Sequence, residues 1–259
     1  MKPHDLMEKV EKAVRAAGRI IRDTRLDESH ITVKGTANFA TLVDFEVQSY
    51  LMQELAGIIP GSNVITEESE DNRFNLDSPT WVLDPVDGTT NLMYGCRMSA
   101  ISIALYIGQK PELGIIFNPE SDEMFTAEAG KGAFLNGRSI SVSRNGRLQD
   151  SLIGFGTTPY DKTKSLQTFE RVHSIFTACR DVRRSGSAAL DIAYVACGRL
   201  DGFFELNLQP WDYDAGIIIL KEAGGRITRF SGEEINVLKQ GSVLASNGLI
   251  HEQLQNIIR

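Results

Sequence analysis

Two aspartates flank a predicted turn in the first half of the chain, at a spacing that suits a cation site. The apolar run 81–83 predicts a buried strand, and Asp84 closes that run. Pro85 favours an extended backbone at Asp84 and begins a turn, on which Asp87 lies. Gly88 allows the chain to bend sharply, because glycine has no Cβ atom. The carboxylates of Asp84 and Asp87 can therefore point to one side of the turn and hold hard divalent cations.

The residues after this turn predict the start of a helix. Thr89, Thr90 and Asn91 are all favourable N-cap residues. Free backbone N–H groups at a helix start attract anions, so a phosphate oxygen could bind beside the acidic turn. The first four or five residues of such a run, taken alone, are more often only a solvated turn. The buried strand before them and the three capping residues after them favour a binding site.

The run 81–91 resembles the signature of the inositol monophosphatase family of magnesium-dependent phosphatases. Further segments of the chain are also similar to segments of this family. They lie at 40–44, 66–69, 130–137, 184–189, 210–216 and 222–225. Each segment alone is a weak signal, whereas their joint occurrence in order extends the resemblance over nearly the whole chain.

The resemblance implies two or three Mg²⁺ ions, held mainly by carboxylates. Glu67, Asp84 and the backbone carbonyl of Val86 would hold the first ion. Asp84, Asp87 and Asp212 would hold the second, so that Asp84 bridges the two. One ion activates the water that attacks phosphorus in line, and the other stabilises the departing ester oxygen. Asp212 could alternatively serve only as a helix N-cap, but the family pattern makes it a ligand.

The resemblance also assigns the groups that would hold the phosphate and the attacking water. The backbone N–H groups of Gly88, Thr89 and Thr90 would bind the phosphate. The Thr89 hydroxyl would orient the water, with Asp44 as its carboxylate partner. Together with the ligand Glu67, Asp44 and Thr89 make up the predicted catalytic set.

A second group of residues is implied to contact the substrate alcohol. Gly186, Ser187 and Ala188 would line the pocket from a helix start, and Glu205 would accept hydrogen bonds from substrate hydroxyls. The alternative for Glu205 is a surface glutamate at a strand end. Glu68 is either an outer partner of the metal site or a solvated carboxylate.

Two other classes of phosphatase are disfavoured by the sequence. His4, His30, His173 and His251 lie outside every motif, which argues against histidine-based phosphatases and hydrolase triads. The haloacid-dehalogenase type uses an Asp-x-Asp motif, whereas the spacing here is Asp-x-x-Asp with a proline between.

Three positions depart from the family pattern without removing a predicted ligand. Thr66 stands where the family often has glycine, and Arg97 where it often has proline. Asp214 adds a charge beside the predicted ligand Asp212.

Composition limits the compartment and the partners. The chain has 259 residues, 42% of them hydrophobic and 24% charged, as expected for a soluble globular protein. A net charge of -7 argues against a nucleic-acid partner. The cysteines are 3 in number and far apart, which suits reduced thiols in the cytoplasm. No stretch predicts a signal peptide or a membrane span, so we expect a cytoplasmic protein. We also expect a homodimer.

The elements that must position these residues fall into two halves of one compact catalytic unit. Residues 1–150 predict an α+β half, with helices at about 5–25 and 43–58, followed by a largely antiparallel meander and the metal motif. Residues 151–259 predict an α/β half with the substrate pocket, because helices and strands alternate there. The fold class is therefore α/β, and the resemblance implies the layered αβαβα sandwich of the inositol monophosphatase and fructose-1,6-bisphosphatase type.

The function implied is Mg²⁺-dependent hydrolysis of a small phosphorylated metabolite, with inositol 1-phosphate as the first candidate. Fructose 1,6-bisphosphate, histidinol phosphate, NADP and adenosine bisphosphate are alternative substrates found in the same family. A regulatory binding protein on the same fold is the alternative from another class. Sensitivity to lithium is also implied, since Li⁺ resembles Mg²⁺ in size and has half its charge.

Overall fold

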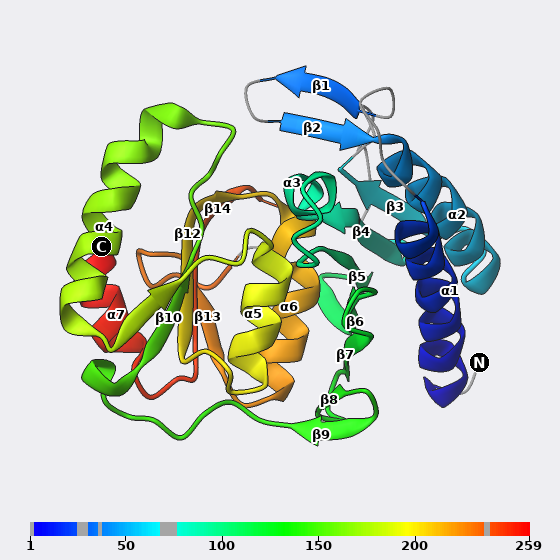
Figure 1. The fold of residues 1–259 in the computed structure, drawn as a ribbon. Coiled ribbons are helices and arrows are strands. Elements are labelled where there is room, and N and C mark those ends of the chain that lie inside the picture. Colours follow the sequence, from blue (N-terminus) through cyan, green and yellow to red (C-terminus); the bar gives the residue numbers. More distant parts are fainter. Residues whose placement is uncertain (1–2, 25–30, 36–37, 68–76, 236–238) are drawn as a thin grey trace.

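The computed structural model of the chain describes residues 3–24, 31–35, 38–67, 77–235 and 239–259, and residues 3–5, 33–35 and 38–39 by their backbone alone. Five layers follow one another across the molecule (Figure 1). Helices α1 (Pro3–Asp23) and α2 (Leu42–Ile58) form one outer layer, and α4 (Ser165–Ala178) and α7 (His251–Ile258) form the other. Helices α5 (Ala188–Ala196) and α6 (Pro210–Glu222) lie between the two large sheets. This arrangement confirms the predicted αβαβα sandwich.

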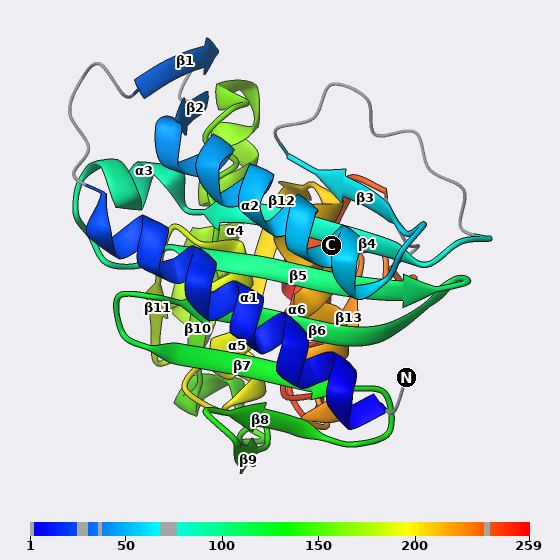
Figure 2. The same ribbon diagram turned by 90° about the vertical axis from the view of Figure 1, so that its right-hand side faces the viewer.

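The first large sheet has 7 strands in the order β3-β4-β5-β6-β7-β8-β9. Every neighbouring pair is antiparallel except β3 and β4, which are parallel. Figure 2 shows α1 and α2 lying across one face of this sheet. The strands are β3 (Asn63–Thr66), β4 (Thr80–Asp87), β5 (Ala100–Ile107), β6 (Lys110–Asn118), β7 (Glu123–Glu128), β8 (Ala133–Leu135) and β9 (Arg138–Ile140).

The second large sheet has 5 strands in the order β11-β10-β12-β14-β13. Strand β10 runs parallel to β11 and β12, whereas β14 runs antiparallel to β12 and β13. The strands are β10 (Leu152–Phe155), β11 (Asp181–Arg183), β12 (Gly202–Leu208), β13 (Arg226–Thr228) and β14 (Gly241–Ser246). A separate ribbon pairs β1 (Ile31–Gly35) with β2 (Asn38–Thr41).

Buried apolar side chains form a separate cluster at each interface between layers. One cluster joins α1 and α2 to the seven-stranded sheet and includes Val47 and Leu83. A second joins α5 and α6 to both sheets, and a third packs α7 on the five-stranded sheet. The amphipathic spacing predicted for α1 is confirmed, because Val10, Val14 and Ile21 are buried there.

Close packing of α6 against the seven-stranded sheet depends on a glycine in β6. A Cβ atom added to Gly114 would lie 2.4 Å from Ile218 Cγ2 and 2.7 Å from the Ala215 carbonyl oxygen. Any larger residue would push α6 away from the sheet. This contact matters for the site, because α6 carries Asp212.

Several elements differ from the sequence prediction. Strand β4 continues through Pro85 to Asp87, where we expected a turn to begin. Helix α6 begins at Pro210 and so includes Asp212, which could have preceded the helix as its N-cap, since proline is favourable at the first helical position. Strands β2, β8 and β13 were not predicted, because runs of only 3 or 4 residues carry little periodicity. No helix of the described residues is long and apolar enough to cross a membrane.

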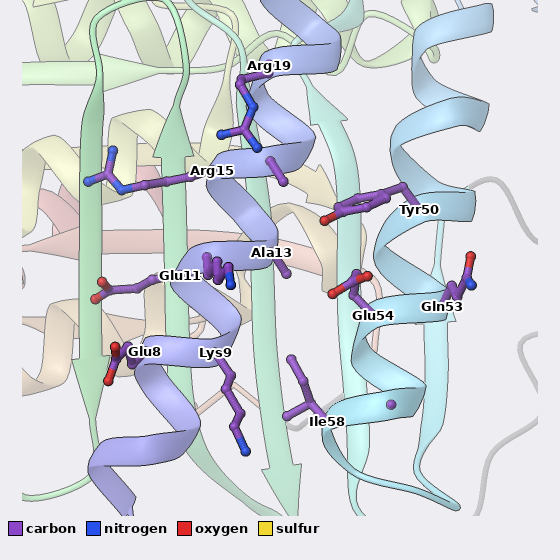
Figure 3. A pocket seen from close by; sticks show the side chains of 13 residues that line it. Glu8, Lys9, Glu11, Ala13, Arg15, Arg19, Tyr50, Gln53, Glu54 and Ile58 are labelled. Atoms are coloured by element: carbon purple, nitrogen blue, oxygen red, sulfur yellow. The ribbon is translucent and has the colours of Figure 1, made fainter.

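A wide groove between α1 and α2 faces away from the inner helices (Figure 3). Its volume of about 870 Å³ exceeds that of the predicted site, yet none of the predicted site residues lines it. Its walls carry charges of both signs, including Arg19 and Glu54 on either side of Tyr50. Burial and then the neighbouring Glu54 raise the pKa of Tyr50, while Arg19 lowers it. The size of the groove therefore does not mark it as the place where the chemistry occurs.

Candidate active site

The central acidic motif lies at the end of β4, where the strand contains a bulge. Asp84 pairs with Ser102 and Asp87 with Ala100, so β4 has one more residue than β5 over this span. In a regular strand, residues three apart face opposite sides of the sheet. The extra residue removes that opposition and allows both carboxylates to serve one site. The Val86 N–H donates to Asp84 Oδ1 at 3.0 Å and holds the buried carboxylate in place.

Asp87 is held by the start of helix α5, on the other side of the site. Ser187 donates its hydroxyl to Asp87 Oδ2 at 2.6 Å, and the Ala189 N–H donates to the same oxygen at 2.7 Å. Burial raises the pKa of Asp87 from 3.8 to about 6, although both hydrogen bonds lower it. One carboxylate oxygen of Asp87 is therefore committed to α5.

Asp212 enters the site from the first turn of α6. Its Oδ2 accepts a hydrogen bond from the Gln209 N–H at 2.7 Å, which makes Gln209 the N-cap residue. The sequence prediction placed Asp212 before the helix as a possible N-cap, and that placement is wrong. Burial, followed by repulsion from Asp87 and Glu67, raises the pKa of Asp212. The repulsion shows that the three carboxylates lie near one another.

Thr89 links the acidic motif to helix α2. Its hydroxyl lies 2.9 Å from Asp44 Oδ1 and 3.1 Å from the Val86 carbonyl oxygen. Asp44 is fully buried at the start of α2, where its other oxygen accepts hydrogen bonds from the backbone and the hydroxyl of Thr41. The structure thus brings together the predicted partners Asp44 and Thr89.

Helix α3 (Thr89–Met93) follows the motif as expected, but its cap differs from the prediction. The N-cap residue is Gly88, with φ 94° and ψ 38°, rather than Thr89, Thr90 or Asn91. This left-handed conformation favours glycine. A Cβ atom at Gly88 would also lie 3.0 Å from the Met98 carbonyl oxygen.

The carboxylates of this acidic cluster repel one another. Burial raises the pKa of Asp84 well above its ordinary value, and repulsion from Glu67, Asp87, Asp212 and Asp44 adds to it. Among the described residues, no lysine or arginine forms an ion pair with Asp84, Asp87 or Asp212. Converging carboxylates without a counter-charge are the hard oxygen donors that Mg²⁺ prefers.

The carboxylate oxygens of this cluster are the type of ligand that a divalent cation binds, but they are not arranged as a closed metal site. In the part of the chain that the structure describes, no three acidic, histidine or cysteine side chains already stand in a closed metal-binding group. Glu68 lies outside the described residues.

The pocket above this cluster is built from elements of both sheets and has a volume of about 310 Å³. Its lining includes nine of the predicted site residues: Asp87, Gly88, Thr89, Thr90, Gly186, Ser187, Ala188, Glu205 and Asp212. The other predicted residues lie below or beside them, at the ends of β3 and β4 and the start of α2.

Glu205 is buried inside β12, beside an irregularity in its pairing with β14, and not at a strand end. Its Oε1 accepts a hydrogen bond from the Thr158 N–H at 2.8 Å. Burial raises the pKa of Glu205 from 4.5 to about 7, with Asp87 adding to the effect and Arg184 reducing it. The alternative of a solvated surface glutamate is therefore wrong.

Some residues that shape the pocket were missed from the sequence. Asn91 donates through Nδ2 to the Met98 carbonyl at 2.7 Å and to the Ser185 carbonyl at 3.0 Å, which ties α3 to the chain before α5. The buried Asp191 of α5 also lines the pocket, and burial raises its pKa to about 8. Asn91 was noticed only as a capping residue, and nothing in its neighbourhood in the sequence signals a bridge to residue 185.

Two family-like segments turn out to support the fold at a distance from the pocket. Both oxygens of Glu222 accept hydrogen bonds from the turn at 130–132, from the Gly130 and Gly132 N–H groups at 2.8 Å each. Asp214 does not place a free charge beside Asp212 as expected. It is fully buried, and burial raises its pKa well above the ordinary value, which opposes ionisation.

Comparisons with known proteins agree with this fold. The profile of the inositol monophosphatase family matches residues 3–259. The chain belongs to the inositol monophosphatase family.

Relatives of this chain carry two kinds of name. Inositol monophosphatase 2 of Solanum lycopersicum is 38% identical over 253 residues, covering 95% of each chain. The Nus factor SuhB of Escherichia coli K12 is 36% identical over 246 residues, covering 94% of this chain and 92% of that protein. Among solved structures, the extragenic suppressor protein suhB of Bartonella henselae has a TM-score of 0.91 and 36% identity, covering 98% of both chains.

Proposed function

We propose that this chain is a Mg²⁺-dependent phosphomonoesterase and that inositol 1-phosphate is its preferred substrate. The observation that carries the proposal is the cluster of Asp84, Asp87 and Asp212, which repel one another without a described cationic partner. Only bound cations can make such a site attractive to an anionic phosphate ester. Membership of a phosphatase family supports the same reaction class.

The residues that would hold two or three Mg²⁺ ions are Glu67, Asp84, Asp87, Asp212 and the carbonyl of Val86. When bound, Mg²⁺ lowers the pKa of water and neutralises charge on the phosphoryl oxygens. Asp84 is the natural bridging ligand, because four other carboxylates all act on its pKa.

Thr89 is positioned to orient the attacking water. If its hydroxyl donates its single proton to Asp44 Oδ1, 2.9 Å away, its lone pairs remain available to accept a hydrogen bond from water. The carboxylate of Asp44 thereby fixes the direction of the Thr89 hydroxyl. The N–H groups of Gly88, Thr89 and Thr90 open the helix α3 and would bind the phosphate oxygens, since the first N–H groups of a helix have no partner within it.

Glu205 is the residue that favours a polyol ester. A carboxylate offers about four lone-pair sites, and the Thr158 N–H occupies one of them. The remaining sites can accept hydrogen bonds from neighbouring hydroxyls, and their charge repels a second phosphate. Glu205→Ala should therefore lower kcat/KM for inositol 1-phosphate by the equivalent of about 1.5–3 kcal/mol, and that for an aryl phosphate by much less. Equal losses on both substrates would mean that Glu205 supports the metal site or the fold.

The reaction class is tested by measuring phosphate release with Mg²⁺ and with excess chelator. The substrates are inositol 1-phosphate, fructose 1,6-bisphosphate, histidinol phosphate, NADP and adenosine bisphosphate. We expect Mg²⁺-dependent release, fastest from inositol 1-phosphate, and a loss of at least ~100-fold in Asp87→Asn. Release that continues unchanged in chelator would overturn the proposal, and a faster rate on another ester would reassign the substrate.

A second candidate is a regulatory binding role on the same fold. It is favoured by relatives that are 36% identical and carry the name Nus factor SuhB. A binding protein has no need of the acidic cluster, so Asp87→Asn separates the two roles. A cellular function that survives Asp87→Asn while phosphate release is lost would favour the binding role. The cytoplasmic location, the homodimer and the lack of a nucleic-acid partner stay predictions.

A further inference from the structure

One loop of the pocket carries an aromatic residue that has no part in the reaction described above. The loop 156–161 joins β10 to the short 3₁₀ turn at Lys162–Lys164 and lines the pocket with Gly156, Pro159 and Tyr160. Tyr160 is 57% exposed, and its surface opens onto the pocket that also contains Asp87 and Asp212. The Tyr160 side chain therefore borders the space that a substrate would fill.

The loop is fastened to the strand that carries Glu205. The Gly156 N–H donates to the Phe204 carbonyl at 3.0 Å, and the Thr158 N–H donates to Glu205 Oε1 at 2.8 Å. A Cβ atom at Gly156 would lie 1.8 Å from Glu205 Oε2, so the loop backbone runs directly against that carboxylate. The loop and Glu205 thus form one wall of the pocket.

Thr158 keeps the loop in a strained form. Its φ is 45°, which is costly for a β-branched residue, and its buried hydroxyl has no hydrogen-bond partner among the described residues. Such strain persists only where the surroundings hold it, and it is often found at binding sites. The Asp161 N–H closes the turn by donating to the Thr158 carbonyl at 3.1 Å, and Arg184 Nε donates to the Thr157 hydroxyl at 3.2 Å. These contacts direct the next residues, Pro159 and Tyr160, towards the pocket.

The tyrosine stands over the acidic floor of the site. Desolvation raises the pKa of the Tyr160 phenol, and the nearby charges of Glu67, Asp212, Asp87 and Asp84 raise it further. The phenol therefore stays neutral and offers a flat aromatic face. A neutral ring above charged groups is suited to the uncharged, alcohol part of a phosphate ester.

We propose that Tyr160 is a specificity-determining residue, whose ring covers one face of the substrate alcohol and selects cyclic polyol phosphates over short linear ones. The inference rests on the proposed phosphatase function. A cyclic polyol has C–H groups on its faces and hydroxyls around its rim. The ring of Tyr160 would remove the C–H groups from water while Glu205 accepts hydrogen bonds from the rim. A short linear polyol can reach Glu205 but leaves most of the aromatic face uncovered.

The test compares kcat/KM for inositol 1-phosphate and glycerol 1-phosphate in the presence of Mg²⁺. The variants are Tyr160→Ala, Tyr160→Phe and the control Phe169→Ala, whose aromatic side chain is 56% exposed on α4 and does not line the pocket. We expect Tyr160→Ala to lose about tenfold on inositol 1-phosphate, mainly through KM, and less than about twofold on glycerol 1-phosphate. Tyr160→Phe and Phe169→Ala should retain the selectivity of the unmodified chain.

Two outcomes would overturn the role of Tyr160 without affecting the proposed phosphatase function. Equal losses on both esters in Tyr160→Ala would assign the residue to the metal site or the loop. A loss in Tyr160→Phe as large as that in Tyr160→Ala would assign the effect to the hydroxyl rather than the ring face. Failure of the proposed function looks different, because the unmodified chain would then release no phosphate from either ester or from p-nitrophenyl phosphate. A rise in melting temperature with Mg²⁺ in each variant would confirm that the fold is intact.

Discussion

Replacing Asp87 with asparagine should make the cation-free protein more stable while it removes activity. The buried carboxylate has its pKa raised from 3.8 to about 6, so the folded protein disfavours the charged form. This shift corresponds to about 3 kcal/mol at 1.36 kcal/mol for each pKa unit. The asparagine side chain keeps an oxygen that can accept the hydrogen bonds from Ser187 and Ala189, and it carries no charge.

The size of the stabilisation by Asp87→Asn depends on pH. A carboxyl group whose pKa is raised in the folded state does not lower the free energy of unfolding at a pH well below 4, because the folded and the unfolded state are then both protonated. The free energy of unfolding falls as pH rises from 3.8 through about 6, and the full penalty is present above that range. Asp87→Asn should therefore be about 3 kcal/mol more stable than the unmodified chain at pH 8, and about 0.5 kcal/mol more stable at pH 4.

Thermal unfolding in excess chelator measures this difference. For a chain of this length, about 3 kcal/mol corresponds to a rise in melting temperature of roughly 6–12 °C. Adding Mg²⁺ should raise the melting temperature of the unmodified chain more than that of the variant, because ligand binding stabilises only a state that binds it. The exposed carboxylate of Glu234 offers a control, Glu234→Gln, that should show no such pattern. A lower melting temperature for Asp87→Asn at pH 8, or a gain that is as large at pH 4, would refute the reasoning.

Three further predictions concern lithium and two buried groups. Li⁺ should inhibit phosphate release more strongly than Na⁺ at equal ionic strength, because it matches Mg²⁺ in size with half the charge; identical titration curves would contradict this. Burial lowers the pKa of His251 from 6.5 to about 4, so stability present above pH 6.5 should be lost as pH falls, by about 2 kcal/mol at pH 5. Between pH 7 and pH 5, the free energy of unfolding measured by chemical denaturation should fall less for His251→Gln than for the unmodified chain. An equal fall in both proteins would contradict the assignment. Asp214→Asn should flatten the decline in stability as pH rises above about 4, since burial raises the pKa of Asp214; an unchanged pH dependence of the melting temperature would show that Asp214 is not the cause.

The order of the layers could be predicted because the long elements carry a clear period or apolar run. Helix α1 buries Val10, Val14 and Ile21, and the near-continuous apolar run of β5 is buried along most of its length. The bulge in β4 could not be predicted, because Pro85 is typical of a turn and its effect depends on the pairing with β5. The division near residue 150 stays a prediction, although the strands of the first large sheet all end before residue 141 and those of the second begin after residue 151.

Within the site, the residues that were predicted share a local motif, and the ones that were missed do not. Asp84, Asp87 and Thr89 stand within six residues of one another, so a short stretch of sequence identifies them. Tyr160 lies in a loop whose sequence shows only a proline and ordinary polar residues. The direction of Tyr160 follows from the strained backbone of Thr158 and from the hydrogen bond that the Thr158 N–H donates to Glu205. Glu205 lies 47 positions after Thr158 in the chain. This contact follows from the parallel pairing of β10 with β12, which leaves no periodic trace in the sequence.

The packing of α5 and α6 between the two sheets explains why the acidic cluster can form at all. Asp87 comes from a strand of the first sheet, Asp212 from α6, and the donors to Asp87 from α5. Both helices lie between the two sheets, and Gly114 allows α6 to approach β6 closely. The apolar contacts of this layer therefore hold together carboxylates that repel one another. A cation that relieves the repulsion would stabilise the same interface, so metal binding and the joining of the two sheets should strengthen each other.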